Sequence, residues 1–247
     1  MARSVRSFVR REGRFTPAQR RAVAELGGRW CLDERGGRID LDAVFGRRAP
    51  RIVEVGCGAG ETLLALAGEH PENDCLGIEV FQPGIGRILQ ALERHDYRNA
   101  RLLCADAQEV FETRIAPASL TAVCVFFPDP WPKTRHHKRR LLQPAFMTRV
   151  AESLAAHGRM YVATDWEDYA ESVLEAARCV PLLQGLGVDG PRVPRPRWRP
   201  LTRFEARARR DGRRVHDFAF GLVQVQERPV AAQAVAQRGG EGAQSGG

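Results

Sequence analysis

A glycine-rich turn follows a short apolar run, and its residue types suit the binding of a cofactor. Residues 53–60 read Val-Glu-Val-Gly-Cys-Gly-Ala-Gly, with Gly56 as the first glycine and Glu61 directly after the last. Glycines here allow positive φ and a close approach of the backbone to a ligand. A dinucleotide fingerprint needs its third glycine at position 61, and the carboxylate of Glu54 would repel a diphosphate but attract an ammonium group. The pattern therefore favours S-adenosylmethionine, whose methionine part carries an ammonium group, over NAD.

Two further acids stand where apolar runs end. Glu79 closes the run 75–80, about twenty residues after the glycine turn, where a carboxylate can accept hydrogen bonds from both ribose hydroxyls of a nucleoside. Asp106 follows the run 102–105 and can accept a hydrogen bond from an adenine amino group. Each acid alone could be only a helix cap, and the glycine turn only a turn. Together, the glycine turn, Glu54, Glu79 and Asp106 stand in register along successive strand ends. This combination predicts a nucleoside-bearing cofactor.

A rigidly held aspartate follows the fourth apolar run. Residues 126–133 read Phe-Phe-Pro-Asp-Pro-Trp-Pro-Lys. Three prolines hold Asp129 at the edge of the predicted sheet, next to the place where the sulfonium of the cofactor is expected. We therefore expect Asp129 to take part in the chemistry.

The segment after this aspartate is strongly basic. The whole chain has a formal net charge of +8, which favours a polyanionic partner, although a genome rich in arginine codons would produce the same excess. The segment alone could be only the solvated start of a helix. It holds both lysines of the chain, which has 38 basic residues, so we interpret it as a nucleic-acid contact that needs lysine as a compact point charge. Its basic residues are Lys133, Arg135, His136, His137, Lys138, Arg139 and Arg140.

These residues need a scaffold, and short apolar runs that alternate with longer amphipathic runs indicate one. The alternation is typical of βαβ units in a parallel sheet, so the chain is predicted to be an α/β protein with about six or seven strands. A length of 247 residues suits one sizeable domain. Strands are expected at 52–55, 75–80, 102–105, 120–127, 159–163 and 215–226, and helices at 62–67, 84–93, 143–156 and 167–178.

Three segments fall outside this alternation. Residues 1–48 form a basic arm and lead-in that we expect to pack on a catalytic domain at 49–228. Within that domain, the Pro- and Arg-rich stretch 187–200 predicts an extended surface loop. The tail 229–247 consists mostly of Ala, Gln, Gly and Ser and is expected to be disordered.

Cysteine spacing and hydropathy narrow the class of protein. The six cysteines form no Cys-x-x-Cys pair and no cluster with histidine, so neither a metal site nor a disulfide framework is predicted. The cysteines are interpreted as small buried side chains in a reducing cytosol, which predicts a cytoplasmic protein. No stretch of about twenty apolar residues is present that would span a bilayer, so a membrane role is not expected.

Several motifs together resemble the bacterial tRNA (guanine-N7-)-methyltransferase family. The Pro-Asp-Pro-Trp block with its basic cluster is highly specific, whereas many methyltransferases share the glycine turn. The resemblance spans about residues 5–225. Its motifs are Arg-Ser-Phe-Val-Arg-Arg at 6–11, Glu-Val-Gly at 54–56, Gly-Ile-Glu-Val at 77–80, Phe-Phe-Pro-Asp-Pro-Trp at 126–131, Ala-Thr-Asp-Trp at 163–166 and Thr-Arg-Phe-Glu at 202–205.

The resemblance implies a Rossmann-like methyltransferase fold with a mostly parallel seven-stranded sheet, helices on both faces and an antiparallel last strand. It implies S-adenosylmethionine as methyl donor and tRNA as partner, with no obligate protein partner. The acceptor would be N7 of a guanine in the variable loop (position 46 in tRNA numbering). Glu54, Glu79, Asp106 and Asp129 match the family's cofactor-contacting acids, and Asp129 also matches its proposed catalytic residue.

The resemblance also implies the substrate contacts. The basic segment from Arg135 to Arg140 matches the family's RNA-contacting segment. This chain departs from the family at Arg203, where lysine is common, and at 206–210, where a shorter Arg-Gly turn is common. The residues that match substrate-binding positions are Lys133, Asp165, Thr202, Arg203, Phe204 and Glu205.

Guanine N7 has a lone pair and no proton, so its methylation needs no general base and positioning should dominate. A fixed carboxylate, Asp129 or Asp165, would stabilise the positive charge that develops on the purine. Trp131, Trp166 and Phe204 are candidates to hold a base turned out of the tRNA, although core packing would explain Trp166 and Phe204 equally well. The alternatives are a related enzyme acting on another RNA nucleotide or a small molecule, and a non-catalytic RNA-binding protein or an NAD enzyme.

Overall fold

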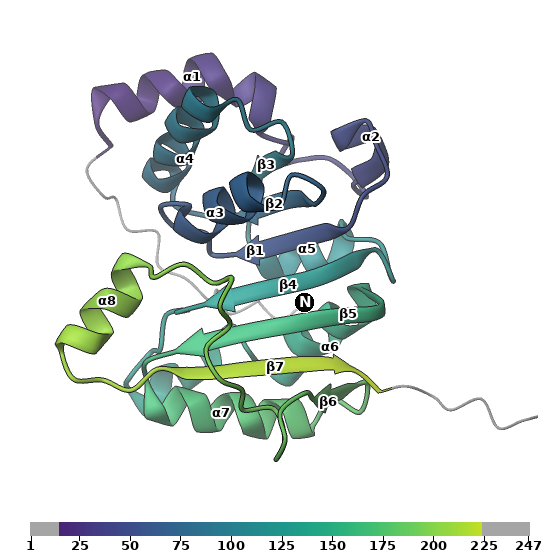
Figure 1. The fold of residues 1–247 in the computed structure, drawn as a ribbon, viewed down its shortest axis with the longest axis vertical. Coiled ribbons are helices and arrows are strands. Elements are labelled where there is room, and N and C mark those ends of the chain that lie inside the picture. Colours follow the sequence, from purple (N-terminus) through teal and green to yellow (C-terminus); the bar gives the residue numbers. More distant parts are fainter. Residues whose placement is uncertain (1–14, 224–247) are drawn as a thin grey trace, which may run out of the picture.

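Seven strands form one mixed sheet in the computed structural model, which describes residues 15–223 (Figure 1). The strand order is β3-β2-β1-β4-β5-β7-β6. Neighbours from β3 to β5 are parallel, whereas β7 runs antiparallel to β5 and β6, so the predicted mostly parallel sheet with an antiparallel last strand is confirmed. The strands are β1 Arg51–Val55, β2 Asp74–Ile78, β3 Ala100–Leu103, β4 Leu120–Phe126, β5 Leu154–Thr164, β6 Leu183–Gly185 and β7 His216–Leu222.

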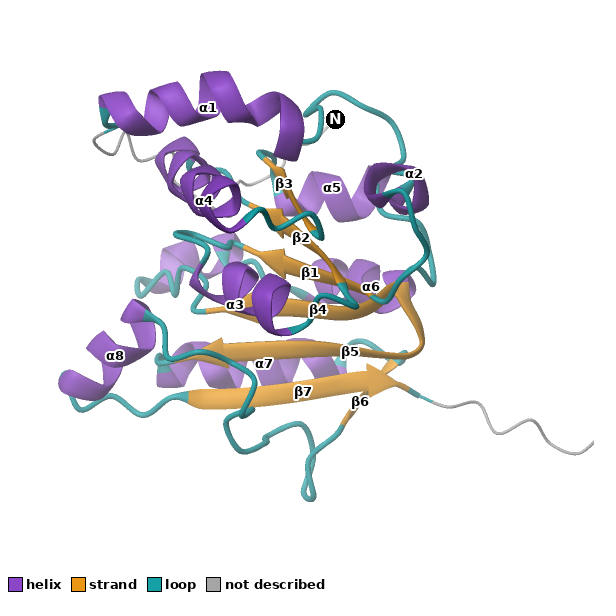
Figure 2. Cartoon of the chain, turned by 45° about the horizontal axis from the view of Figure 1, so that its top comes forward, coloured by secondary structure: helices purple, strands orange, loops and turns teal. Residues whose placement is uncertain are grey.

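Helices cover both faces of the sheet (Figure 2). On one face, α1, α3 and α4 pack around a buried cluster that includes Trp30, Leu66 and Leu92. On the other face, α5, α6 and α7 contribute side chains such as Phe111 and Met147 to the larger core. The helices are α1 Pro17–Trp30, α2 Leu41–Phe45, α3 Glu61–Glu69, α4 Gln82–His95, α5 Ala107–Thr113, α6 Pro144–Ser153, α7 Glu167–Arg178, α8 Arg203–Arg210 and the 3-10 helix η1 Thr134–Arg139.

Helix α4 shows how the sequence pattern produces this packing. Ile85, Ile88, Leu89 and Leu92 recur at the i, i+3, i+4, i+7 spacing of one helix face, and all four are buried. Burial of such a side chain contributes on the order of 1.5–3 kcal/mol. The helix ends at Asp96, whose φ of 47° is left-handed. Because α4 starts just beyond β2, this packing holds the carboxyl end of that strand in place.

The carboxyl ends of the parallel strands meet at one edge of the sheet. From β1 the chain crosses to β2 on one side, and from β4 it crosses to β5 on the other side. In open α/β sheets, ligands bind where the strand order reverses in this way. Helix α8 lies beside the same edge (Figure 1). A binding site is therefore expected between the ends of β1 and β4.

The predicted helix 143–156 is wrong beyond Ser153, where α6 ends and β5 begins. Leu154 already pairs with Leu120 at the start of β4. The alanines at 155 and 156 favour a helix by intrinsic propensity, but sheet pairing overrides that preference.

The segment 187–200 contains no helix, and one isolated bridge, from Arg192 to Phe218 in β7, joins it to the sheet. Its side chains are exposed or partly exposed except that of Arg199, which is buried. The predicted arm up to residue 14 and the tail 229–247 lie outside the described residues.

Between residues 15 and 223 no helix is both long enough and apolar enough to cross a bilayer. Within the same range, no three His, Cys, Asp or Glu side chains are grouped so that they could hold a metal ion. The six cysteines are free thiols.

Candidate active site

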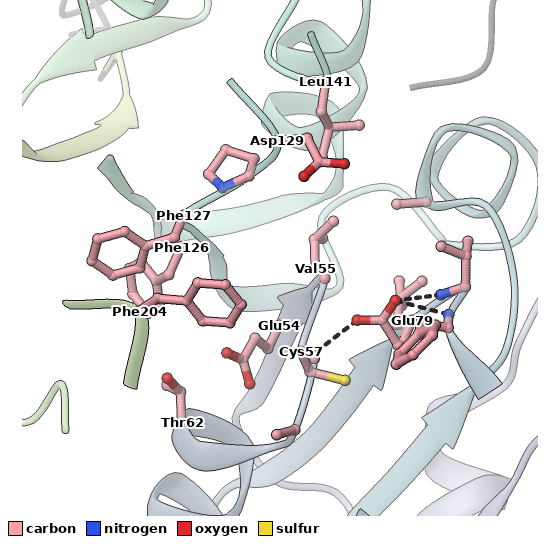
Figure 3. A pocket seen from close by; sticks show the side chains of 18 of the residues that line it. Glu54, Val55, Cys57, Thr62, Glu79, Phe126, Phe127, Asp129, Leu141 and Phe204 are labelled. Carbon is pink, nitrogen blue, oxygen red and sulfur yellow. Dashed lines mark hydrogen bonds between the residues drawn. The ribbon is translucent and has the colours of Figure 1, made fainter. Parts of the chain in front are cut away.

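A cavity of about 450 Å³ opens at the carboxyl edge of the sheet (Figure 3). Its walls come from the turns after β1, β2 and β3, from the loop after β4 and from the start of α8. Its volume lies within the range of small-molecule sites. The predicted site residues that line it are Glu54, Gly56, Glu79, Asp106, Asp129, Thr202 and Phe204.

The turn after β1 has the backbone conformation that only glycine adopts without strain. Gly56, Gly58 and Gly60 have φ values of 71°, 54° and 81°. A β-carbon on Gly60 would come within 2.5 Å of Cγ1 of Ile88 in α4. The turn therefore packs closely on α4 and presents mainly backbone to the cavity.

Glu79 lies just beyond β2 and is held by three backbone amides. Its Oε2 accepts a hydrogen bond from Gly58 N at 2.6 Å, and its Oε1 accepts from Val80 N at 2.7 Å and Phe81 N at 2.9 Å. A carboxylate offers about four lone-pair sites, so it can still accept from a ligand. Glu79 thus fixes the glycine turn and also presents a rigid acceptor to the cavity, as a ribose contact requires.

Glu54 lies on β1 with 5% of its surface exposed, and its Oε2 has no hydrogen-bond partner. Burial raises the pKa of Glu54 to about 8, while hydrogen bonds to Thr62 and Leu63 oppose the rise and the charges of Glu79 and Glu61 add to it. The sequence predicts an anion here, but the structure places a carboxyl group that holds its proton near neutral pH. An unpaired buried oxygen at a cavity fits a ligand that brings N–H donors and positive charge, such as the ammonium group of methionine.

The other two acids come from different walls. Asp106 caps α5 by accepting a hydrogen bond from Gln108 N at 3.0 Å, so it serves as a helix cap and also lines the cavity. Asp129 lies in the loop after β4, on another wall from Glu54 (Figure 3). This loop has left-handed φ values of 52° at Phe127 and 46° at Trp131, which non-glycine residues rarely adopt. Such strain on both sides of one carboxylate indicates a functional constraint on its position.

The basic segment after Asp129 folds as the short helix η1. Arg135 and Lys138 are exposed on this helix, and Lys133 is exposed directly before it. The ring of His136 packs edge-on against Trp131. Partial desolvation and the neighbouring cations, Arg135 first among them, lower the pKa of His136, so it adds a neutral ring to this surface rather than a charge.

Two arginines of this segment have structural contacts. Arg139 stacks on the ring of Trp131, with 4.9 Å from its guanidinium carbon to the ring centre. Arg140 is buried, donates a hydrogen bond to Pro130 O at 2.9 Å and pairs with Asp168 at the start of α7. Arg140 thus anchors the loop of Asp129 to the protein and does not face solvent.

The Thr-Arg-Phe-Glu motif forms the first turn of α8. Thr202 caps the helix by accepting from Glu205 N at 3.3 Å, and Phe204 is 61% exposed at the rim of the cavity. Arg203 donates hydrogen bonds from its backbone N and its Nε to the carboxylate of Glu61 at 2.9 and 3.0 Å, which joins α8 to the start of α3, directly after the glycine turn. Glu205 is fully buried among arginines.

Several predicted substrate residues lie outside the cavity wall. Asp165, just beyond β5, pairs with Arg213 at 2.8 Å. Sequence reasoning missed the pocket-lining residues Thr62 and Leu141, which are ordinary helix and loop residues by their spacing. It also missed Arg199, because nothing in the alternating arginines of its loop marks one of them as buried. The predicted substrate and RNA residues outside the cavity wall are Lys133, Arg135, His136, His137, Lys138, Arg139, Arg140, Asp165, Arg203 and Glu205.

The fold and the cavity define the class of protein. A Rossmann-like sheet whose switch point carries a glycine turn and acidic strand ends fits a nucleoside-bearing cofactor. The match to a methyltransferase family identifies this cofactor as S-adenosylmethionine. The family profile described as "Putative methyltransferase" matches residues 48–218. The solved structure of the 16S rRNA methyltransferase KamB shares the fold, with a TM-score of 0.54 and 16% identity over 80% of this chain and 99% of that one.

Curated relatives narrow the class to one family. The tRNA (guanine-N(7)-)-methyltransferase of Leifsonia xyli subsp. xyli is 47% identical over 215 residues, which cover 87% of this chain and 94% of that protein. The enzyme of the same name from Alkalilimnicola ehrlichii is 49% identical over 221 residues, 88% of this chain and 92% of that protein. The chain belongs to the tRNA (guanine-N(7)-)-methyltransferase family, as the motif resemblance predicted.

Proposed function

We propose that the protein transfers the methyl group of S-adenosylmethionine to N7 of a guanine in the variable loop of tRNA. The observation that carries this proposal is the cavity, in which the unpaired Oε2 of Glu54, the amide-held carboxylate of Glu79 and Asp129 line one space. These groups suit the ammonium, the ribose and the reacting end of the donor. The family name supports the acceptor atom and tRNA. We also propose a cytoplasmic location, in agreement with free cysteines at all six positions.

The chemistry follows from the acceptor atom. Bound S-adenosylmethionine supplies a methyl group on a sulfonium. The N7 lone pair forms the new N–C bond as the S–C bond breaks, so positive charge moves to the purine and no proton is transferred. Asp129 is assigned to stabilise that charge and to accept hydrogen bonds from the base edge. The strained turn that carries Asp129 holds this carboxylate in place before the base arrives.

Two exposed basic elements border the cavity and are assigned to the tRNA backbone. One is the segment after Asp129, and the other is α8, which starts at the cavity rim with Phe204. We assign Arg140 and Glu205, which are buried, to the support of these elements rather than to RNA contact. The exposed cations proposed to contact phosphates are Lys133, Arg135, Lys138, Arg207, Arg210 and Arg214.

Affinity for tRNA is expected to fall by about a hundredfold or more between 50 and 200 mM salt, because each neutralised phosphate releases a counterion. Filter binding over a salt series measures this. Lys138→Ala should reduce the slope of log affinity against log salt by about 1. Arg48→Ala is the control, since Arg48 is an exposed arginine beside the opposite edge of the sheet, between α2 and β1. A flat salt response would contradict the proposed phosphate contacts.

A labelled-methyl assay tests the function directly. Wild-type protein with radiolabelled S-adenosylmethionine should label a tRNA transcript, and digestion should release 7-methylguanosine. A transcript in which adenine replaces the variable-loop guanine is the matched control and should take up no label. Label in the control transcript would indicate another nucleotide. No label in either transcript, together with a melting temperature raised by NAD and not by S-adenosylmethionine, would exclude a methyltransferase.

A further inference from the structure

A buried guanidinium lies behind the cavity wall, outside the chemistry assigned above. Arg199, in the loop before α8, is 1% exposed. Its Nη1 donates to Oε2 of Glu205 at 2.6 Å, and its Nη2 donates to both carboxylate oxygens of Asp217 in β7 at 3.0 and 3.1 Å. A buried charge costs several kcal/mol unless it is paired in good geometry, so this side chain can occupy the site only in that arrangement.

The same guanidinium stacks on one wall of the cavity. Its central carbon lies 5.3 Å from the ring centre of Phe126 and 5.6 Å from that of Phe127, and both rings line the cavity. Phe127 has the left-handed φ of 52°, which in a non-glycine residue costs about 1–3 kcal/mol. Asp129 follows in the same turn. Arg199 therefore supports the strained backbone that places Asp129.

The guanidinium also holds the start of α8, whose Phe204 lies near Phe126 and Phe127 at the cavity (Figure 3). Glu205 belongs to the first turn of α8, whose Thr202 and Phe204 line the cavity. Its buried carboxylate further accepts a hydrogen bond from Arg195 Nε at 2.9 Å and pairs with Arg209. The start of α8 is thus attached, through Glu205 and Arg199, to the rings that precede Asp129.

We propose that Arg199 is a positioning residue for the methyl transfer. It fixes the turn of Asp129 relative to the start of α8, which carries Phe204. The methyl donor and the guanine base are thereby held at the distance and angle that the transfer needs. This inference rests on the proposed function. The planar guanidinium of Arg199 pairs with two carboxylates and stacks on two rings, so it fixes the angles between these groups as well as their distances. The ammonium group of a lysine has no such planar geometry and cannot fix the angles.

The first test is Arg199→Lys, which keeps the charge and loses the fork. At saturating tRNA and donor, the single-turnover rate should fall at least tenfold, because small misplacement of reacting groups costs up to about a hundredfold. The dissociation constant for S-adenosylmethionine, measured by calorimetry, should change by less than about threefold, because Glu54 and Glu79, which are assigned to its ammonium group and its ribose, do not contact Arg199. A rate within threefold of wild type would overturn the proposal.

A second variant separates positioning from stability. Arg199→Met leaves Asp217 without its cation and should lower the melting temperature, whereas the double variant Arg199→Met with Asp217→Asn removes both charges and should recover it. If Arg199 positions the site, the single-turnover rate of the double variant should stay low although its melting temperature recovers. Recovery of both together would show a role in stability alone and overturn the proposal.

Arg51→Lys is the matched control, because Arg51 is a mostly buried arginine that pairs with Asp42 and Asp74 at the amino edge of the sheet. Its rate should stay within threefold of wild type, even if its melting temperature falls.

Hydrogen exchange separates the inference from the proposed function, since it needs no tRNA. In Arg199→Lys, the amides of Phe127, Asp129 and Trp131, the residues of this turn that are not proline, and those of 203–207 should exchange faster, while those of α4 should be unchanged. If wild type methylates no tRNA, the proposed function fails, and this exchange pattern still decides whether Arg199 holds both segments. Unchanged exchange in both segments would overturn the positioning role.

Discussion

Replacement of Asp129 by asparagine is expected to lower kcat for tRNA methylation by about a hundredfold or more. Asparagine keeps the size of the side chain but loses the charge, and removal of one preorganised electrostatic contact to a developing charge costs about 10²–10³ in rate. The loss should appear in kcat, because positive charge builds up on the purine only as the methyl group moves.

Steady-state kinetics with saturating tRNA and S-adenosylmethionine measure this effect. Asp189→Asn is the matched control, since Asp189 is an exposed aspartate in the turn after β6, at the far edge of the sheet. Its kcat should equal that of wild type. Activity of Asp129→Asn within threefold of wild type would remove Asp129 from the mechanism.

The affinity for S-adenosylmethionine is expected to rise with pH, by up to tenfold per pH unit between about pH 6 and 8. Burial raises the pKa of Glu54 to about 8 in the free protein, so at pH 7 this group is mostly protonated. Pairing with the donor's ammonium group requires the carboxylate, so binding releases a proton and becomes more favourable as pH rises. The rise should end near pH 8, where Glu54 is ionised before binding.

Calorimetry in buffers of different ionisation enthalpy counts the released proton, which should approach one at pH 7. Glu54→Gln should show no such release, and its affinity at pH 8 should be about tenfold to a hundredfold lower, since a hydrogen bond to a charged group contributes about 1.5–3 kcal/mol. Wild-type affinity that is independent of pH between 6 and 8 would show that Glu54 does not receive the ammonium group.

The same group makes the free protein less stable as pH rises. Its pKa is higher in the folded state, about 8, than the ordinary value of 4.5, so the folded state binds more protons between these values. The contribution of Glu54 to stability is therefore full below about pH 4.5 and is lost as pH rises to about 8. Glu54→Gln should raise the melting temperature of the free protein above pH 8, where wild type must bury a charge.

The acids of the cavity were predictable because they obey a local rule. A side chain at the end of a parallel strand must lie at the carboxyl edge of the sheet, whatever the rest of the chain does. Glu54 is the penultimate residue of β1, Glu79 and Asp106 follow β2 and β3, and the cavity wall contains all three. The motif resemblance added Thr202 and Phe204, which reach the same cavity from the start of α8 although they lie far away in the sequence.

The charged residues of the rim were harder to assign. The basic run at 135–140 predicts a uniform RNA-facing surface, but Arg140 turns inward to Asp168 while Lys138 is exposed. Glu205 was predicted as a substrate contact, and its carboxylate is buried among arginines. A charge pattern in sequence shows that cations are present, but burial and pairing depend on neighbours that only folding brings together.

The amino-acid sequence by itself determined the alternation of strands and helices in the parallel part of the sheet, the glycine turn and the acids at the strand ends, because periodicity, φ preference and chain direction act over a few residues. Only the tertiary structure decided the pKa of Glu54 and the partners of Arg199. Desolvation at Glu54 comes from the elements packed around β1, and Arg199 is paired across α8 and β7, so both effects depend on contacts between distant parts of the chain.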